Sequence, residues 1–150
     1  METGQLFPPF SLADQDGKVW TNADLAGRPY VIYFYPKDDT SGCTVEACEF
    51  RDARPDFGDV PVLGVSPDDA KSHGKFMKKH ALNFPLLVDN EQVLLNALGI
   101  WVEKSMYGKK YMGVERTTYL VGADGKIVAQ WNKVKPAGHA AEVLEKLRNL

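Results

Sequence analysis

Residues 29–35, with the sequence PYVIYFY, constrain the fold of this chain more than any other segment. They are β-branched and aromatic throughout, without the polar alternation of a strand that has one face in water. Such a run is typical of a strand buried on both faces of its sheet, and Pro36 marks its end. A strand of this kind needs a covering layer on each side, which favours a sheet flanked by helices.

Helical spacing of apolar residues predicts four helices. The first is predicted over residues 43–57, beginning at the cysteine. The second is predicted with Ser66 as its N-cap and Pro67 as its first helical residue. Two more are predicted at 91–100 and 139–150, and the last of these is amphipathic.

Short apolar runs predict strands at 60–65 and 84–89, between these helices. Asp-Gly pairs with apolar flanks predict β-hairpins within 10–20 and 111–132. This alternation predicts the α/β class, and the length of 150 residues predicts a single domain over 1–150. A thioredoxin-like fold fits the order, with a mixed central β-sheet flanked by helices and an N-terminal β-hairpin extension. Other mixed α/β folds fit the order too, so the order by itself does not decide between them.

Composition argues against two classes of function. The 150 residues have a net charge of −2, so they lack the basic surface that nucleic acids require. No apolar run approaches the roughly 20 residues that a membrane-spanning helix needs, and the N-terminal segment lacks the pattern of a secretory signal. We therefore expect a cytoplasmic protein with no nucleic-acid or membrane partner. In that reducing compartment a cysteine pair is more often catalytic than structural.

The chain has two cysteines, Cys43 and Cys48. A cysteine at a helix N-terminus meets unpaired N–H groups and the positive end of the helix dipole, which favour a thiolate. Before it, Gly42 allows close backbone approach to a small ligand, Thr40 offers a hydroxyl, and Pro36 can shield the site from water. A buried, inert cysteine is the alternative, but the polar run that precedes Cys43 favours a reactive thiol in an exposed pocket.

The spacing of the two cysteines limits what they can form. In one intact helix their Cα atoms lie about 8.6 Å apart, beyond the roughly 7 Å that a disulfide allows. Either the pair never bonds or the first turns of the helix unwind when it does, so a standing crosslink is the least favoured reading. A zinc site is also disfavoured, because His73, His80 and His139 are dispersed and are expected on helix surfaces.

Arg116 stands at the start of a predicted central strand, in the segment GVERTTYL. It either supplies a positive charge to Cys43 and polarises substrate oxygens, or it is a solvated residue at a strand end. Glu46 and Arg51 lie on the predicted Cys43 helix. They either form local salt bridges or contact the residues that bind the substrate.

The segment YFYPKDDTSGCTVEACEFRD resembles the active-site region of the peroxiredoxins, in particular the peroxiredoxin Q or bacterioferritin comigratory protein subfamily. The spacing of Pro36, Thr40 and Cys43 carries the motif, and the segments VLGVSPDD, FPLLVD and ERTTYLVGADGKI resemble the subfamily in the same order. The resemblance covers nearly the whole chain. It implies a thioredoxin-like fold and a thiol peroxidase that reduces hydrogen peroxide and organic hydroperoxides, with no metal, haem or flavin.

The resemblance also implies a role for each site residue. Cys43 matches the peroxidatic cysteine, which becomes a sulfenic acid. Thr40 matches the residue that hydrogen-bonds the peroxide, Pro36 the one that shelters the sulfenate, and Arg116 the active-site arginine. Cys48 matches the resolving cysteine, whose disulfide with Cys43 is reduced by thioredoxin or a similar dithiol. The resemblance further implies a monomer.

One position departs from the subfamily, because Ser41 stands where a proline is usual. Losing the proline removes a restraint on φ, so the expected consequence is a more mobile loop and an altered rate. We expect resistance to over-oxidation, since the elements that sensitise some peroxiredoxins have no counterpart here. Two other hypotheses remain open at this point: a non-catalytic redox sensor on the same fold, and a general dithiol oxidoreductase, which the cysteine spacing disfavours.

Overall fold

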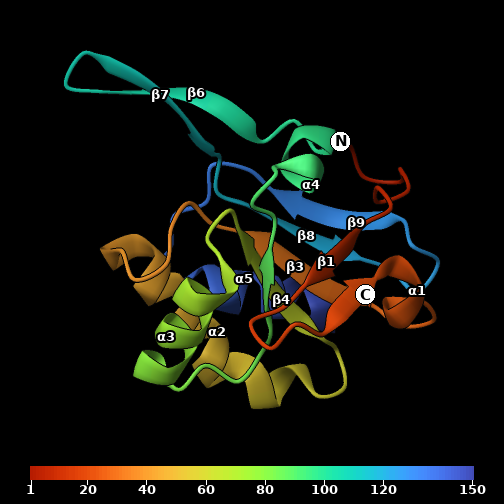
Figure 1. The fold of residues 1–150 in the computed structure, drawn as a ribbon. Coiled ribbons are helices and arrows are strands. Elements are labelled where there is room, and N and C mark those ends of the chain that lie inside the picture. Colours follow the sequence, from red (N-terminus) through yellow and green to blue (C-terminus); the bar gives the residue numbers. More distant parts are fainter.

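A computed structural model describes residues 1–150, and a mixed five-stranded sheet forms their centre (Figure 1). The strand order is β5-β4-β3-β8-β9, and β3 pairs in parallel with β4 but antiparallel with β8. The strands of this sheet are β3 (Tyr30–Phe34), β4 (Val62–Ser66), β5 (Leu86–Val88), β8 (Thr117–Val121) and β9 (Ile127–Trp131).

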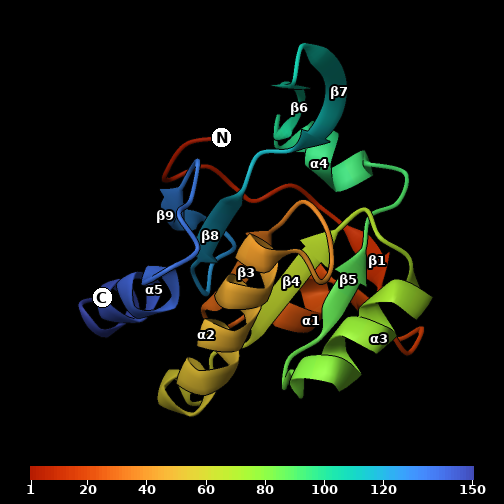
Figure 2. The same cartoon turned by 90° about the vertical axis from the view of Figure 1, so that its left-hand side faces the viewer.

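Helices cover both faces of this sheet. Three long helices supply residues to one apolar cluster, and Figure 2 shows one of them in front of the strands and the other two to its left and right. These are α2 (Ser41–Phe57), α3 (Ala70–His80) and α5 (His139–Arg148). The other face is covered by the N-terminal segment and by α4 (Val93–Ala97), while α1 (Asn22–Leu25) is a single turn. None of the helices is long and apolar enough to cross a bilayer.

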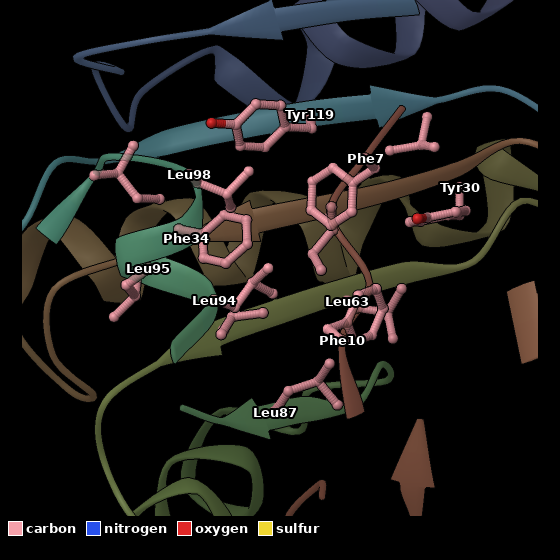
Figure 3. Close-up of a cluster of buried hydrophobic side chains, with 14 of the residues drawn as sticks. Phe7, Phe10, Tyr30, Phe34, Leu63, Leu87, Leu94, Leu95, Leu98 and Tyr119 are labelled. Atoms are coloured by element: carbon pink, nitrogen blue, oxygen red, sulfur yellow. The ribbon is translucent and has the colours of Figure 1, made fainter. Parts of the chain in front are cut away.

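Strand β3 is buried on both faces, as its sequence predicts. Ile32 and Phe34 point into an apolar cluster beneath α4, drawn in Figure 3, and Tyr119 of β8 packs on Phe34 from the same side. Val31 and Tyr33 point into the second cluster, beneath α2, α3 and α5. The period of two along a strand therefore divides one apolar segment between two cores.

Two of the three small hairpins were predicted. The N-terminal hairpin pairs β1 (Ser11–Ala13) with β2 (Val19–Thr21), and the predicted C-terminal hairpin pairs β8 with β9. The third, β6 (Trp101–Met106) with β7 (Lys109–Val114), was not predicted. It projects from the body of the molecule and exposes Tyr107 almost completely (Figures 1 and 2). Because both its faces are largely exposed, its residues show no core-facing alternation for a sequence pattern to detect.

Three predicted helix starts differ from the structure, and among them α4 begins at Val93 instead of residue 91. Ser66 does not cap α3: it is the last residue of β4, where it pairs with Val88 and is fully buried. Asp69 is the N-cap, and its carboxylate accepts a hydrogen bond from the Ser72 N–H at 2.8 Å. Pairing in the sheet thus overrides the local capping preference of Ser66. Helix α2 begins at Ser41, two residues before the predicted start.

Candidate active site

The loop after β3 delivers Cys43 to the first turn of α2. Thr40 is the N-cap residue, with an extended backbone at φ −83° and ψ 159°. The first helical bond runs from the Thr44 N–H to the Thr40 carbonyl at 2.8 Å. Cys43 therefore lies at the positive end of a helix of 17 residues, where the dipole favours an anion.

Sheet pairing brings Arg116 to the same place. Phe34, at the end of β3, is the register partner of Thr117, so the residue before β8 lies beside the loop that follows β3. One guanidinium nitrogen of Arg116 contacts Cys43 Sγ at 3.2 Å, and the other donates to Glu46 Oε1 at 2.7 Å. The Arg116 side chain is 15% exposed, so it is a paired residue rather than a solvated strand end.

Burial sets the charge balance of this cluster. Burial raises the pKa of Glu46 to about 7, although Arg116 opposes the shift, and Glu46 Oε2 is buried without a hydrogen-bond partner. Burial also acts to lower the pKa of Arg116, but Glu46 and Cys43 more than offset this, and the net shift is upward. The Arg116 guanidinium therefore stays charged. Burial of Glu46 disfavours its carboxylate form, because that form loses its hydration.

Gly42 admits the arginine. A Cβ atom at this position would lie 3.3 Å from a guanidinium nitrogen of Arg116 and 3.3 Å from Cγ of Pro136. These distances are tighter than ordinary carbon contacts, so a larger residue would require Arg116 or Pro136 to shift by a few tenths of an ångström. Glycine at this position therefore favours close approach of Arg116 to the first turn of α2.

The other residues of the motif lie in the loop that precedes Cys43. Thr40 is exposed, and its hydroxyl donates to the Lys37 carbonyl at 3.0 Å instead of capping the helix, so its lone pairs remain available. Pro36 is half-buried. Cys43 itself is only 1% exposed. The prediction that the thiol lies in an exposed pocket is therefore wrong. Ser41 is the last exposed residue before Cys43.

Cys48 lies on the same continuous helix and is half-buried, and both cysteines are free thiols. Helical geometry keeps their Cα atoms about 8.6 Å apart. A disulfide between them therefore requires the first turns of α2 to unwind. Arg51, by contrast, does not reach the thiol cluster around Cys43: its guanidinium bonds the carbonyl of His80 at 2.7 Å and the carboxylate of Asp52.

Two of the three histidines are not the surface residues that the sequence predicted, whereas His80 lies near the surface and contacts exposed Asp39. His73 is fully buried and His139 is 1% exposed, and both ring nitrogens of each have partners. For His139, burial lowers the pKa and keeps the ring neutral, despite the opposing effect of Glu142. A signal for His73 was present in the sequence, because it lies three residues before buried Phe76 on the apolar face of α3.

Lys104 of β6 is a second cation that the sequence did not indicate. Burial and the charge of Arg116 lower the pKa of Lys104, while the charge of Cys43 acts in the opposite direction. No sequence pattern joins a lysine in an unpredicted hairpin to a cysteine 61 positions earlier. Only the folded chain brings them together.

A cysteine held against a guanidinium at a helix N-terminus, on a thioredoxin-like sheet, defines a class of thiol-dependent peroxidases. The comparisons with known proteins agree with this class. Residues 3–130 match the AhpC/TSA family, and the chain belongs to that family. It is 45% identical over 152 residues to peroxiredoxin Bcp of Bacillus subtilis, covering 100% of this chain and 97% of the relative. Peroxiredoxin Bcp of Escherichia coli is 40% identical over 150 residues, covering 99% and 96%.

Solved structures of the same family superpose closely. A cysteine-to-serine mutant of PrxQ from Xylella fastidiosa has a TM-score of 0.94 at 38% identity, covering 99% of this chain and 96% of that one. The bacterioferritin comigratory protein of Xanthomonas campestris, a protein with alkyl peroxide reduction activity, has a TM-score of 0.90 at 40% identity, covering 99% and 98%. The predicted thioredoxin-like fold and the peroxiredoxin assignment are thereby confirmed.

Proposed function

We propose that this peroxiredoxin reduces hydrogen peroxide and organic hydroperoxides at Cys43. The thiolate sulfur attacks one oxygen of the peroxide, an S–O bond forms and the O–O bond breaks. The leaving oxygen takes a proton and departs as water or an alcohol, and Cys43 becomes a sulfenic acid. The sulfur loses two electrons and the peroxide gains them, so the step requires no cofactor.

One observation carries this proposal: Arg116 bridges Cys43 Sγ at 3.2 Å and buried Glu46 at 2.7 Å. The guanidinium stabilises the thiolate before reaction and the negative charge that develops on the leaving oxygen during it. The Thr40 hydroxyl lies on the solvent side of the same turn, where it can hydrogen-bond the peroxide. Gly42 keeps the backbone clear, and Pro36 limits the access of water.

In the second step Cys48 attacks the Cys43 sulfenic sulfur. The S–O bond breaks, an S–S bond forms and hydroxide leaves as water after protonation. The intact helix separates the two residues, so the first turns of α2 unwind for this step. Thioredoxin or a similar dithiol then reduces the disulfide by exchange. We propose that the protein acts as a monomeric single domain over residues 1–150 in the cytoplasm, where such dithiols are available.

The test is a steady-state assay with hydrogen peroxide and a thioredoxin system. Wild-type protein is expected to turn over, and Cys43→Ser is expected to lose turnover completely because the nucleophile is absent. Cys48→Ser is expected to accumulate the sulfenic acid, detected by a dimedone adduct on Cys43. Absence of turnover by the wild type with any dithiol would refute the proposal.

The same assay separates the peroxidase from a redox sensor. A sensor would form the Cys43–Cys48 disulfide but turn over slowly, and it would hold a stable mixed disulfide with one protein. The Arg116 contact favours the peroxidase, since thiol–disulfide exchange does not require a group that activates a peroxide oxygen.

We also expect resistance to over-oxidation, because Cys48 lies five residues from Cys43 and intercepts the sulfenic acid once the helix unwinds. Mass spectrometry after treatment with excess peroxide should show mainly the disulfide. Early accumulation of a doubly oxygenated Cys43 without disulfide would contradict this expectation.

A further inference from the structure

Asp38 is a buried carboxylate in the loop that leads to the thiol. It is 7% exposed, and it lies two residues before Thr40. The Tyr35 hydroxyl donates to its Oδ1 at 2.6 Å, and the Ser72 hydroxyl donates to its Oδ2 at 2.7 Å. His73 Nδ1 lies 2.7 Å from the same Oδ2. The carboxylate therefore joins the end of β3 to helix α3.

The hydrogen-bond partners of His73 show that a proton lies between its Nδ1 and Asp38 Oδ2. His73 Nε2 lies 2.8 Å from the Leu87 carbonyl, which can only accept, so Nε2 carries a hydrogen. Nδ1 faces a carboxylate oxygen, and that contact is attractive only if a proton lies between them. One proton is therefore held between His73 and Asp38, either on the ring or on the carboxyl group, and the hydrogen bond is charge-assisted in the first case.

The rest of the loop is held weakly. Asp39 has a left-handed backbone at φ 59°, which is strained for a residue with a side chain. Its carboxylate pairs with Lys79 and His80, but at 43% exposure such surface pairs contribute little. The buried Asp38 carboxylate, with Tyr35, Ser72 and His73 as partners, therefore anchors the segment between β3 and the N-cap of α2, together with the Asp68 carboxylate that accepts from the Asp38 N–H.

A metal site is the alternative use of these residues. Ligand-type atoms of Asp38, Asp68 and His73 lie within 4.8 Å of one another. However, Asp38 Oδ2 already has Ser72 and His73 as partners, and Asp68 Oδ2 accepts from the Asp38 N–H at 2.7 Å and from Ser66 at 3.0 Å. The partners are internal, so the cluster is satisfied without an ion.

We propose that His73 and Asp38 are positioning residues for peroxide reduction: together they fix the loop that places the Thr40 hydroxyl relative to Cys43. This proposal rests on the proposed peroxidase function. Neither residue touches the peroxide. They act through Asp39, the one residue between Asp38 and the N-cap Thr40, because a displaced N-cap changes the distance between the hydroxyl and the thiol.

The experiment measures the reaction of pre-reduced protein with hydrogen peroxide in a single turnover. In His73→Phe, the ring loses both hydrogen bonds, and the second-order rate constant is expected to fall by about 10–100-fold. Alkylation of Cys43 by iodoacetamide does not use Thr40, so its rate should not fall. The ratio of the two rates reports positioning, which a loss of stability alone would not change in folded protein.

A conservative variant and a control sharpen this test. In Asp38→Asn, the side-chain amide can donate to a neutral His73 and to Ser72 while still accepting from Tyr35. The peroxide rate should therefore stay within about fivefold of wild type, whereas Asp38→Ala should match His73→Phe. Lys71 is an exposed residue of α3 that does not bond Asp38 or His73, so Lys71→Ala should leave the rate unchanged.

Each outcome decides the matter. If wild-type protein does not react with peroxide, the proposed function itself fails. If wild type reacts and folded His73→Phe keeps its rate within about threefold, the positioning role is wrong. It is also wrong if Asp38→Asn is as slow as Asp38→Ala. Should His73→Phe not fold, Ser72→Ala decides: a fall of more than about threefold in the rate ratio supports the role, and an unchanged ratio overturns it.

Discussion

The two halves of helix α2 differ in how they are held. In the first half, residues 41–48, Cys43 and Ala47 pack in the same apolar cluster as Phe50, but the buried Glu46 has an oxygen without a partner, and the Cys43 thiol has Arg116 as its hydrogen-bond partner. The second half, residues 49–57, has well-packed aromatic groups and satisfied polar ties. Phe50, for example, is fully buried and stacks on Tyr33 at 4.7 Å.

Polar ties reinforce the second half. Arg51 donates to the His80 carbonyl at 2.7 Å and accepts from Asn83 through its own carbonyl at 3.1 Å. Glu49, where this half begins, accepts from the Gly138 N–H at 3.0 Å. We therefore expect the first half to unwind for disulfide formation while these polar contacts keep the second half folded. A disulfide between two residues of one helix requires one part of that helix to unwind while the other part stays folded.

The largest expected effect comes from removing the anchor. Phe50→Ala deletes a fully buried aromatic side chain, and the free energy of unfolding should fall by about 3–5 kcal/mol. Urea denaturation measures this change. Val45→Ala in the first half is the control, because Val45 is 43% exposed and its loss should cost less than about 0.5 kcal/mol. Equal losses would show that the second half is not the anchor.

The next effect concerns Arg116, which contacts both Cys43 and Glu46 in the first half of α2. Arg116→Lys replaces a forked donor by a single ammonium, which cannot contact Cys43 and Glu46 as the guanidinium does. The value of kcat/KM for hydrogen peroxide should fall by about 10–100-fold, or about 1.4–2.7 kcal/mol. Arg54→Lys is the matched control, since Arg54 bonds only the exposed Gly58 carbonyl. An unchanged kcat/KM in Arg116→Lys would remove the observation on which the mechanism depends.

A smaller effect concerns pH. The pKa of Glu46 rises from 4.5 to about 7 on folding, because burial disfavours the carboxylate. Its contribution to stability is therefore complete below about pH 4.5 and is lost as the pH rises through about 7. Relative to Glu46→Gln, wild type should lose about 2–3 kcal/mol of unfolding free energy between about pH 5 and pH 8. Urea denaturation at both pH values tests this, and identical losses in both proteins would contradict it.

The smallest effect concerns Ser41. This residue is the first of α2, a position that suits proline, and Thr40 before it already has the extended backbone that a following proline demands. Ser41→Pro should therefore stabilise the folded protein by about 0.4–1 kcal/mol. It should also slow formation of the Cys43–Cys48 disulfide, measured by thiol titration after a peroxide pulse. Faster disulfide formation would mean that the first half does not unwind from its N-terminal end.

The sequence predicted those features that depend on neighbouring residues. Strand β3 follows from an unbroken apolar run, and α2 follows from helical spacing, with a start two residues earlier than predicted. Cys43 at a helix N-terminus is likewise a local feature, and so is its separation from Cys48. Resemblance to a family added Arg116 as a site residue, which local pattern alone had left undecided.

The tertiary structure decided what depends on residues distant in the chain. The contact between Arg116 and Cys43 exists because Phe34 and Thr117 are register partners, and no local pattern specifies an antiparallel register across 83 positions. His73 was expected at the surface, but it is buried because the loop after β3 supplies Asp38 as its partner. Residue types and local spacing thus determined the elements and the reactive thiol. Pairing and packing determined which charges and hydrogen bonds surround that thiol, because these contacts form only when distant segments meet.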